Sequence, residues 1–342
     1  MHMNLAIKTD VHLKDLTTFR LGGPAEYTVD ITNLDELREA LLFAQKEHIS
    51  FKVIGGGSNI LAKDAGMKGL LIRNHIKGIK YTSEADYVFV SAGAGESWDA
   101  LVADTVEKGL FGLENLSLIP GTVGASPIQN IGAYGVEVKK TIHSVEVYDV
   151  QESVITHFSN AECQFGYRDS IFKRPGGERY IVLRVTFRLK ETGDTFIGYR
   201  DLADYFVRIG IARATPAEVR EAVIEIRTAK LPDTTKVGTA GSFFKNPVVT
   251  SEQFDELKKK FPDLPGYAED GAMKISLGWV LDKMLNMRGV CMGDACVHDR
   301  QALVIINKGN ATSSDVDMLA QDIEKKVVEL LGINIEREVR EF

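Results

Sequence analysis

The chain has 342 residues, of which 44% are hydrophobic and 26% are charged, and its formal net charge is −7. This length exceeds what one hydrophobic core usually serves, so two or three domains are expected. The negative balance argues against nucleic acid as a main partner, and no apolar stretch reaches the roughly 18 residues that a membrane span requires.

The first 110 residues alternate predicted helices and strands. A helix is expected over 33–48, where Asn33 is a capping residue and leucines recur on one face. Strands are expected at 51–54, 69–72 and 87–92. A second helix follows Ser97 and ends at Gly109.

Two glycine-rich loops stand out in this part of the chain. Gly55-Gly56-Gly57-Ser58-Asn59 follows a short β-branched run, and 119–135 repeats the same small-residue character. Glycine lets backbone approach a ligand closely, and successive exposed N–H groups bind anions. The two loops together predict a long cofactor that is bound by backbone groups. One such loop alone would fit a tight turn equally well.

Standard nucleotide fingerprints do not fit these loops. The triple glycine lacks the lysine of a P-loop, and Gly93-Ala94-Gly95-Glu96-Ser97-Trp98 has Trp98 where a Rossmann motif needs its third glycine. We therefore expect neither a P-loop nor a Rossmann dinucleotide site.

Beyond the second loop the pattern changes to antiparallel strands. Strands are expected at 144–150, 153–158 and 180–189, the first two forming a hairpin, and 194–204 is expected to be a polar connection. Thr215 then caps a helix that runs to about Arg227. A domain boundary is placed near 230–233.

The last third is predicted to be mixed in structure. Helices are expected at 251–261, 277–286 and 314–331, with a strand at 302–306 between the last two. Alternation over 333–340 predicts a final strand with Glu338 on its charged face.

Single residues in two polar segments are candidates for chemistry. Arg168 lies in a turn between strands and would grip a carboxylate with two hydrogen bonds, unless it is an ordinary solvated arginine. Ser242, between glycines and phenylalanines, would serve as a proton donor in a partly apolar site, or simply as a turn hydroxyl. It lacks the GxSxG pattern of a serine hydrolase.

Metal, disulfide and export signals are weak. The seven histidines show no HxxxH or HExxH spacing, so no metal site is expected. Three cysteines without CxxC spacing oppose a disulfide framework and a cysteine zinc site. The N-terminus has no basic region followed by an apolar run, so the cytoplasm is the expected compartment.

Six segments taken together closely resemble the UDP-N-acetylenolpyruvoylglucosamine reductase family. Each is short, but their order along nearly the whole chain is specific; the segments are 18–25, 55–59, 119–135, 167–173, 240–247 and 338–340. The resemblance implies an α+β protein with a flavin fold of the vanillyl-alcohol-oxidase type. Its expected parts are two FAD-binding subdomains, 1–77 and 78–228, and a C-terminal substrate domain, 229–342.

The resemblance also implies an activity. Noncovalent FAD, reduced by NADPH, would reduce the enolpyruvyl group of UDP-N-acetylglucosamine enolpyruvate to UDP-N-acetylmuramate for peptidoglycan synthesis. Arg168 matches the residue that polarises the substrate carboxylate, Ser242 the proton donor and Glu338 the active-site glutamate. The protein is expected to act as a monomer, without nucleic acid, membrane or metal.

The remaining site residues also follow from the resemblance. Expected contacts to the substrate nucleotide, phosphates or sugar are Tyr134, Tyr199, Lys230 and Asn246. Expected FAD contacts are Val53, Ile54, Gly55, Gly56, Gly57, Ser58, Asn59, Ile119, Pro120, Gly121, Thr122, Gly124, Ala125, Ser126, Ile128, Gln129, Asn130, Gly132, Ala133 and Tyr134.

Tyr199 places the chain with the family type whose extra loop closes a tyrosine over the substrate. The following Arg200 departs from that pattern, where a smaller residue is expected. Two rivals remain: a flavin oxidase on the same fold, and a nucleotide-sugar-binding regulator without catalysis. Many such oxidases tether flavin to a histidine or cysteine in the first glycine loop, and residues 55–59 contain neither.

Overall fold

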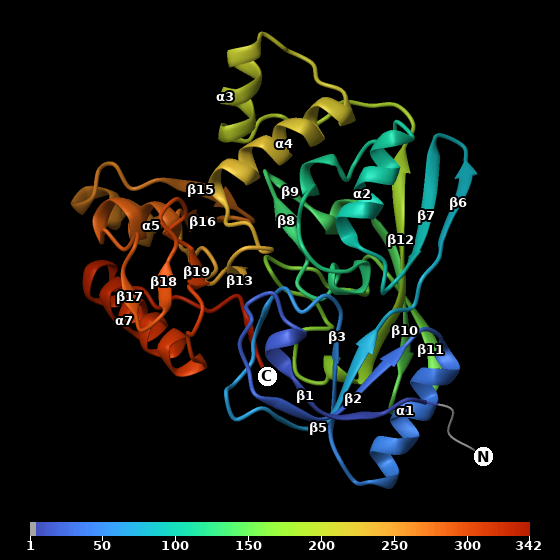
Figure 1. Cartoon of the computed structure of the whole chain (residues 1–342). Coiled ribbons are helices and arrows are strands. Elements are labelled where there is room, and N and C mark those ends of the chain that lie inside the picture. The colour runs from blue at the N-terminus through green and yellow to red at the C-terminus, as the bar shows by residue number, and fades with distance from the viewer. Residues whose placement is uncertain (1–4) are drawn as a thin grey trace. The chain divides into compact units, whose positions relative to one another are not determined.

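A computed structural model describes residues 5–342 of the chain (Figure 1). The chain forms two compact units that are not continuous in sequence. The N-terminal unit contains residues up to 10, 26–56 and 68–229; the C-terminal unit contains 11–25, 57–67 and 230–342. These units cut across the expected division at 77, since 11–25 and 57–67 belong with the C-terminal unit, and the three-part division stays a prediction.

The first sheet follows the order β1-β2-β5-β3, with bounds Lys8–His12, Pro24–Ile31, Met67–Asn74 and Phe51–Ile54. Strands β3 and β5 pair in parallel, and the non-helical connection between them, 55–66, is long enough to return the chain to the same edge of the sheet. Helix α1 (Leu34–Lys46) buries Leu37 and Ala40 beside Leu70 and Ile72. Asn33 accepts a hydrogen bond from the Glu36 N–H, so the predicted cap is confirmed.

A five-stranded antiparallel sheet forms the second half of the N-terminal unit. Its order is β11-β10-β12-β7-β6, with bounds Val154–Ser159, Ile142–Asp149, Tyr180–Lys190, Tyr87–Gly93 and Ile79–Glu84. The predicted β10–β11 hairpin is confirmed. Helix α2 (Trp98–Glu107) buries Trp98 edge-on against Phe187. A small hairpin, β8 (Gly132–Ala133) and β9 (Val136–Glu137), follows the second glycine loop.

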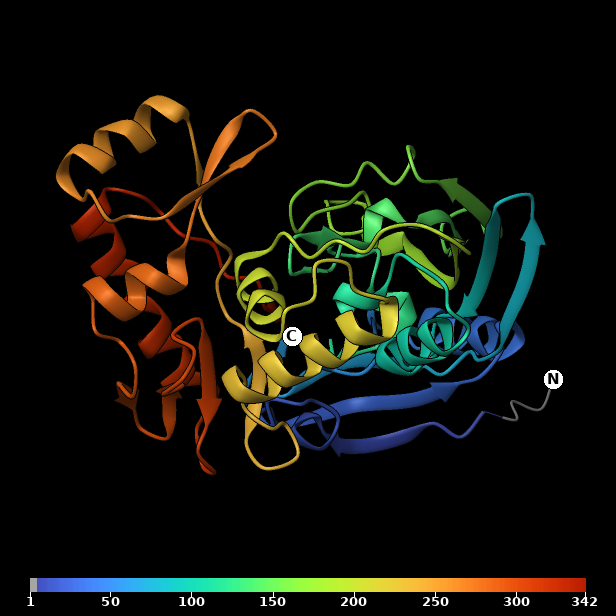
Figure 2. The same ribbon diagram turned by 90° about the horizontal axis from the view of Figure 1, so that it is seen from above.

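Helices α3 (Arg200–Ile209) and α4 (Pro216–Lys230) complete this unit. The polar connection expected over 194–204 is wrong in its second half, where α3 begins. Leu202 and Phe206, one helical turn apart, are buried with Val219 and Val223 of α4. This small core stabilises a helix whose sequence is otherwise polar. Tertiary packing therefore decides the structure of this segment against its local sequence pattern. In Figures 1 and 2, α4 lies beside α2.

The C-terminal unit holds two larger sheets and three helices. One sheet has the order β13-β19-β18-β17 (Gly238–Ser242, Val304–Asn307, Ala295–Val297 and Cys291–Met292), and the other β14-β16-β15 (Val248–Val249, Ala272–Ile275 and Gly266–Glu269). The helices are α5 (Ser251–Lys260), α6 (Leu277–Trp279), which continues as a π-helical turn over Val280–Met284, and α7 (Ser313–Leu331). They confirm the helices predicted for this third.

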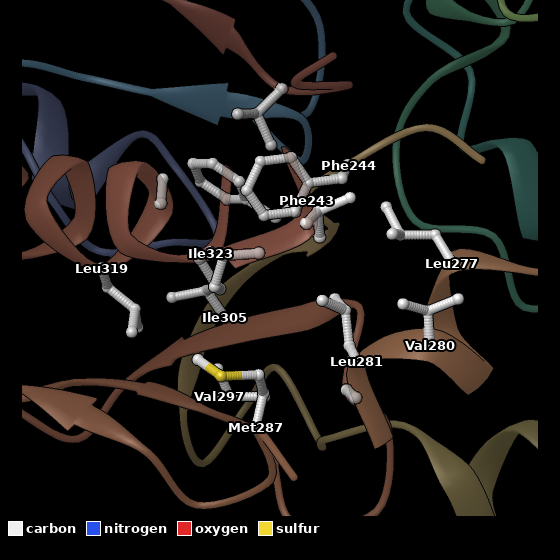
Figure 3. Close-up of a cluster of buried hydrophobic side chains, with 14 of the residues drawn as sticks. Phe243, Phe244, Leu277, Val280, Leu281, Met287, Val297, Ile305, Leu319 and Ile323 are labelled. Atoms are coloured by element: carbon white, nitrogen blue, oxygen red, sulfur yellow. The ribbon is translucent and has the colours of Figure 1, made fainter. Parts of the chain in front are cut away.

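The core of this unit contains adjacent phenylalanines on the segment after Ser242. Phe243 and Phe244 are buried with Ile305 of β19 and Ile323 of α7 (Figure 3). Their rings meet edge to face at 5.1 Å between centroids. This packing fixes the backbone that carries Ser242.

Two expectations for this unit are wrong. The strand expected over 333–340 is reduced to β20 (Arg340–Glu341), which pairs in parallel with β4 (Ile60–Leu61). The alternating charges reflect ion pairs instead, since Arg337 pairs with carboxylates of α7. Cys291 and Cys296 face each other across the β17–β18 pair and form a disulfide, which the odd cysteine count argued against.

No helix within residues 5–342 is both long enough and apolar enough to cross a membrane.

Candidate functional site

The two glycine loops contact each other in the N-terminal unit. A Cβ atom added to Gly55 would lie 2.1 Å from the Thr122 Oγ1, and one added to Gly56 would lie 3.1 Å from the Gly121 Cα. Both glycines are therefore needed for the close approach of the two backbones. The predicted pair of loops forms one small-residue cradle.

The turn that follows β7 packs against the second glycine loop. Val123–Ala125 forms a single 3-10 turn, and the Ser126 hydroxyl donates to the Val123 carbonyl at 2.7 Å. The Gly124 N–H donates to the Ala94 carbonyl at 2.8 Å, and a Cβ at Gly124 would meet the Ala94 side chain. Gly93-Ala94-Gly95 thus supports the second loop by close packing.

The rest of the triple-glycine segment belongs to the C-terminal unit. The Asn59 side-chain amide donates to the Glu338 carbonyl at 3.1 Å, and the Arg340 N–H donates to the Asn59 carbonyl at 3.0 Å. A predicted cofactor residue and the predicted active-site glutamate are therefore hydrogen-bonded just before the paired strands β4 and β20.

Arg168 sits in a tight turn joined to the second glycine loop. Its guanidinium donates to the Gly132 carbonyl at 2.7 Å, and the Asn130 side chain donates to the Gly166 carbonyl at 2.9 Å. Arg168 has a φ of 50°, and the Lys173 ammonium donates to its carbonyl at 3.1 Å. The turn holds the guanidinium beside 130–132, so Arg168 is not a freely solvated arginine.

The side chains of Tyr134 and Tyr199 contact each other. Their rings meet edge to face with centroids 5.5 Å apart. Burial raises the pKa of the Tyr134 hydroxyl to about 12, although the Arg227 charge opposes the rise. Tyr199 is 40% exposed and immediately precedes α3, so a substrate can reach it.

Ser242 and Glu338 are adjacent in the C-terminal unit. Ser242 ends β13 opposite Val304, and the Glu338 N–H donates to the carbonyl of Phe243 at 2.8 Å. Gly241, with a φ of 78°, turns the strand just before the serine. One backbone hydrogen bond thus links Glu338 to Phe243, the residue that follows Ser242.

Lys230 and Asn246 occupy separate segments. Lys230 is the last residue of α4, and the Asn246 side chain accepts the Leu277 N–H at 3.0 Å, at the start of α6. Arg168, Tyr134 and Tyr199 belong to the N-terminal unit, whereas Ser242, Glu338 and Asn246 belong to the C-terminal unit.

Sequence reasoning missed three charged residues near Tyr134. Asp99 of α2 forms a two-pronged ion pair with Arg220 of α4, and Arg227 of the same helix acts on the Tyr134 hydroxyl. The available signal was the seven-residue spacing of the arginines, which puts both on one helix face. Over residues 5–342 the structure contains no His, Cys, Asp and Glu cluster that could hold a metal ion.

Comparison with known protein families matches two parts of the chain. Residues 25–157 match an FAD binding domain, and residues 233–342 match the C-terminal domain of UDP-N-acetylenolpyruvoylglucosamine reductase. These matches confirm the predicted α+β fold, with a flavin-binding part and a C-terminal domain.

Relatives with the same organisation cover nearly the whole chain. A UDP-N-acetylenolpyruvoylglucosamine reductase of Neisseria gonorrhoeae is 43% identical over 335 residues, 97% of this chain and 96% of that protein. The enzyme of the same name from Burkholderia ambifaria is 42% identical over 339 residues, 98% and 96% of the two chains. The crystal structure of the Thermus caldophilus reductase superposes with a TM-score of 0.69 at 25% identity and 99% coverage of both chains.

Proposed function

Because the chain belongs to the UDP-N-acetylenolpyruvoylglucosamine reductase family, we propose that it reduces UDP-N-acetylglucosamine enolpyruvate to UDP-N-acetylmuramate with NADPH. The observation that carries this assignment is 43% identity across 97% of the chain, which includes both the flavin-binding part and the C-terminal domain. The reaction supplies a precursor of peptidoglycan. We place it in the cytoplasm and propose a monomer with three parts, 1–77, 78–228 and 229–342.

The cradle of the N-terminal unit fits an extended cofactor such as FAD. Cβ atoms at Gly55 and Gly56 would meet Thr122 and Gly121, so glycine at these positions lets the two loops lie against each other. The FAD contacts proposed from the resemblance include these four residues. When bound, FAD supplies the two-electron chemistry that couples NADPH oxidation to reduction of the substrate double bond.

Arg168 supplies positive charge for the substrate carboxylate. Reduction at the β-carbon of an enol ether leaves negative charge shared between the α-carbon and the carboxylate. A guanidinium held in place before the reaction stabilises that charge as it forms. The hydrogen bond from Arg168 to the Gly132 carbonyl and the brace from Lys173 supply this fixed position.

Ser242 then delivers the proton that completes the reduction. Its hydroxyl would transfer a proton to the α-carbon, and the reactive enolate makes that transfer feasible from a weak acid. Glu338 is the second candidate of the same unit, tied to the Phe243 carbonyl beside the serine. We propose Tyr134, Tyr199, Lys230 and Asn246 as groups that bind the nucleotide-sugar.

The experiment that tests this function follows the two half-reactions separately. The purified protein should be yellow, with flavin absorption bands, and NADPH should bleach them under anaerobic conditions. Addition of the enolpyruvyl substrate should restore the bands. A colourless protein would support the regulator, and restoration only by dioxygen would support a flavin oxidase.

A further inference from the structure

The disulfide between Cys291 and Cys296 lies at the edge of a sheet, and its two cysteines differ in exposure. Strand β17, which carries Cys291, pairs with β18 and is the outermost strand of the order β13-β19-β18-β17 (Figure 1). Cys291 is exposed, whereas Cys296 is 1% exposed and is buried with Val304 and Ile306. A dissolved reagent therefore reaches the disulfide from the side of Cys291.

A positive charge lies beside the exposed sulfur. The Lys308 ammonium is 3.7 Å from the Cys291 Sγ, and the Gly289 carbonyl oxygen is 3.3 Å from the same sulfur. An adjacent ammonium stabilises a cysteine thiolate, which is the form that attacks and leaves in disulfide exchange. The apolar surroundings of Cys296 instead favour the protonated thiol. The two sulfurs are therefore chemically unequal.

The hairpin around the disulfide is also held in place by other contacts. The Lys308 N–H donates to the Asp294 carbonyl at 3.0 Å, and the Asn310 N–H donates to the Asp294 carboxylate at 3.0 Å. A Cβ atom at Gly293 would lie 2.7 Å from the carboxylate of Asp315 on α7, so the turn packs closely on that helix. These contacts keep the two cysteines aligned when the S–S bond is broken.

A permanent structural crosslink is the other explanation of this disulfide. The two cysteines have a sequence separation of 5, and a disulfide that closes so short a loop restricts the unfolded chain least. In the proposed cytoplasmic location, disulfides are rare and are usually transient, catalytic or redox-sensing. Both points favour a pair that is reduced and reoxidised.

We propose that Cys291 and Cys296 form a thiol–disulfide exchange site whose reactant is a low-molecular-weight thiol such as glutathione. A thiolate attacks the Cys291 Sγ, the bond between the two cysteines breaks, and Cys296 leaves and takes a proton from water. A second thiolate attacks the external sulfur of this mixed disulfide, and Cys291 leaves as a thiolate beside the Lys308 ammonium. The cysteine pair gains two electrons, and the two small thiols are oxidised to their disulfide. The exchange needs neither flavin nor nucleotide-sugar.

Glutathione buffers test the exchange in the folded, FAD-loaded wild-type protein. After alkylation of free thiols, the intact mass should show the pair passing from disulfide to dithiol as the ratio of reduced to oxidised glutathione is raised, while circular dichroism stays native. Cys163 is an internal control that should stay unalkylated, because burial raises the pKa of its thiol to about 12. A native disulfide that resists a large excess of reduced glutathione, or a pair that stays reduced in oxidised glutathione, would overturn the proposal.

Two single variants locate the attacked sulfur. In oxidised glutathione, Cys296→Ser should accumulate a mixed disulfide at Cys291, identified by peptide mass. Cys291→Ser should form at least about 10-fold less, because its remaining cysteines, Cys163 and Cys296, are buried. Cys291→Ser should also keep its fold and melt no more than about 10 °C below the wild type. Equal modification of both variants would contradict attack at Cys291, and loss of the fold in Cys291→Ser would show a structural crosslink instead.

The pH profile of alkylation tests the role of Lys308. In the Cys296→Ser background, Lys308→Met should slow alkylation of Cys291 about two-fold at neutral pH and move the half-maximal rate to higher pH, because the thiolate loses its ammonium partner. Lys308→Arg should recover part of the shift. Lys259→Met is the matched control with an unchanged profile, because Lys259 is exposed on α5 and pairs with Glu256. Profiles that move in both variants, or in neither, would overturn the assignment of Lys308 to this site.

Discussion

Arg337 is expected to be the largest single electrostatic contributor to the stability of the C-terminal unit. Its guanidinium lies 2.6 Å from Asp317, 2.8 Å from Glu324 and 3.1 Å from Glu341. Lys63 joins the same network through Asp317 and Glu341. The network links α7 to the chain terminus and to the segment around β4. Arg337→Met would leave Asp317 and Glu341 with Lys63 and would remove the Arg337 partner of Glu324.

The expected loss of stability in Arg337→Met follows from the partial burial of these side chains. Arg337 is 20% exposed and its partners 24%, 30% and 45% exposed. Exposed ion pairs contribute about 0–1 kcal/mol, whereas removing one partner of a buried pair costs about 3–5 kcal/mol. The intermediate burial and the remaining Lys63 suggest a loss of about 2–3 kcal/mol. At about 2–4 °C per kcal/mol for a protein this large, the melting temperature should fall by about 5–10 °C.

The pH dependence of this loss follows from Asp317. Burial raises the pKa of its carboxyl, but hydrogen bonds from Lys63 and Arg337 outweigh burial, and the net pKa is lowered. A lowered pKa contributes stability that is present above the ordinary value of about 3.9 and lost as pH falls through the folded value. The difference between wild type and Arg337→Met should therefore narrow as the pH falls from 7 toward about 3.

Differential scanning calorimetry across this pH range measures both effects. Arg337→Lys should keep part of the stability, because lysine retains the charge without the planar fork. Arg208→Met serves as control, since Arg208 of α3 and its ion-pair partner Glu225 of α4 are 66% and 59% exposed and losing this pair should change stability by less than about 0.5 kcal/mol. A melting shift no larger than that of the control, or a difference that widens in acid, would refute the reasoning.

The remaining predictions concern the proposed site. Ser242→Ala should leave flavin reduction by NADPH nearly intact but slow reoxidation by the enolpyruvyl substrate by more than about 10²–10⁴-fold, with partial recovery in Ser242→Cys; stopped-flow traces slowed equally in both half-reactions would contradict a proton donor. Tyr199→Phe should raise the KM for the UDP-sugar more than it lowers kcat in steady-state assays, and an unchanged KM would remove Tyr199 from the site. Gly55→Ala should lower the bound FAD measured by absorbance, since its Cβ would lie 2.1 Å from the Thr122 hydroxyl. Thr122→Gly in the same chain should restore part of the FAD, and full FAD content in the single variant would show that the two loops need not touch.

Elements with a strong local signal could be predicted from the sequence. The helix over 34–46 has a capping residue and a periodic apolar face, and the helix over 313–331 ends at Gly332 with a φ of 69°. Helix α3 could not be predicted, because its apolar residues are few and become buried only when α3 packs on α4. The charges of 333–340 suggested a strand, but their partners on α7 lie more than ten residues away in sequence.

In the candidate site, too, local features could be predicted from the sequence, whereas contacts between distant segments could not. The glycine loops were recognisable singly, because glycine has a specific backbone role, but the contact of Gly55 with Thr122 joins segments 67 positions apart. Asp99 is a first-turn carboxylate of α2, and nothing in the local sequence indicates its partner. Its pairing with Arg220 depends on how α4 packs beside α2.

Backbone strain near Arg168 supports its assigned task. Asn130, Tyr134 and Arg168 have φ values of 46°, 48° and 50°, a left-handed conformation that costs a non-glycine residue about 1–2 kcal/mol. Strained residues also occur in ordinary turns elsewhere in the chain, but here hydrogen bonds run in both directions between the strained segments. The Asn130 side chain binds the backbone at Gly166, and the Arg168 guanidinium binds the backbone at Gly132.

Each of these bonds offsets part of the strain in both segments, so neither turn can relax without releasing the other. A guanidinium fixed this way needs little reorganisation when negative charge develops on a substrate carboxylate, which is the condition for electrostatic stabilisation of a transition state. Asn130→Ala should therefore reduce the rate of substrate reduction although Asn130 carries no charge itself. Because Asn130 is also a proposed FAD contact, stopped-flow traces should be compared at equal bound FAD, where reoxidation by the substrate should slow more than flavin reduction by NADPH.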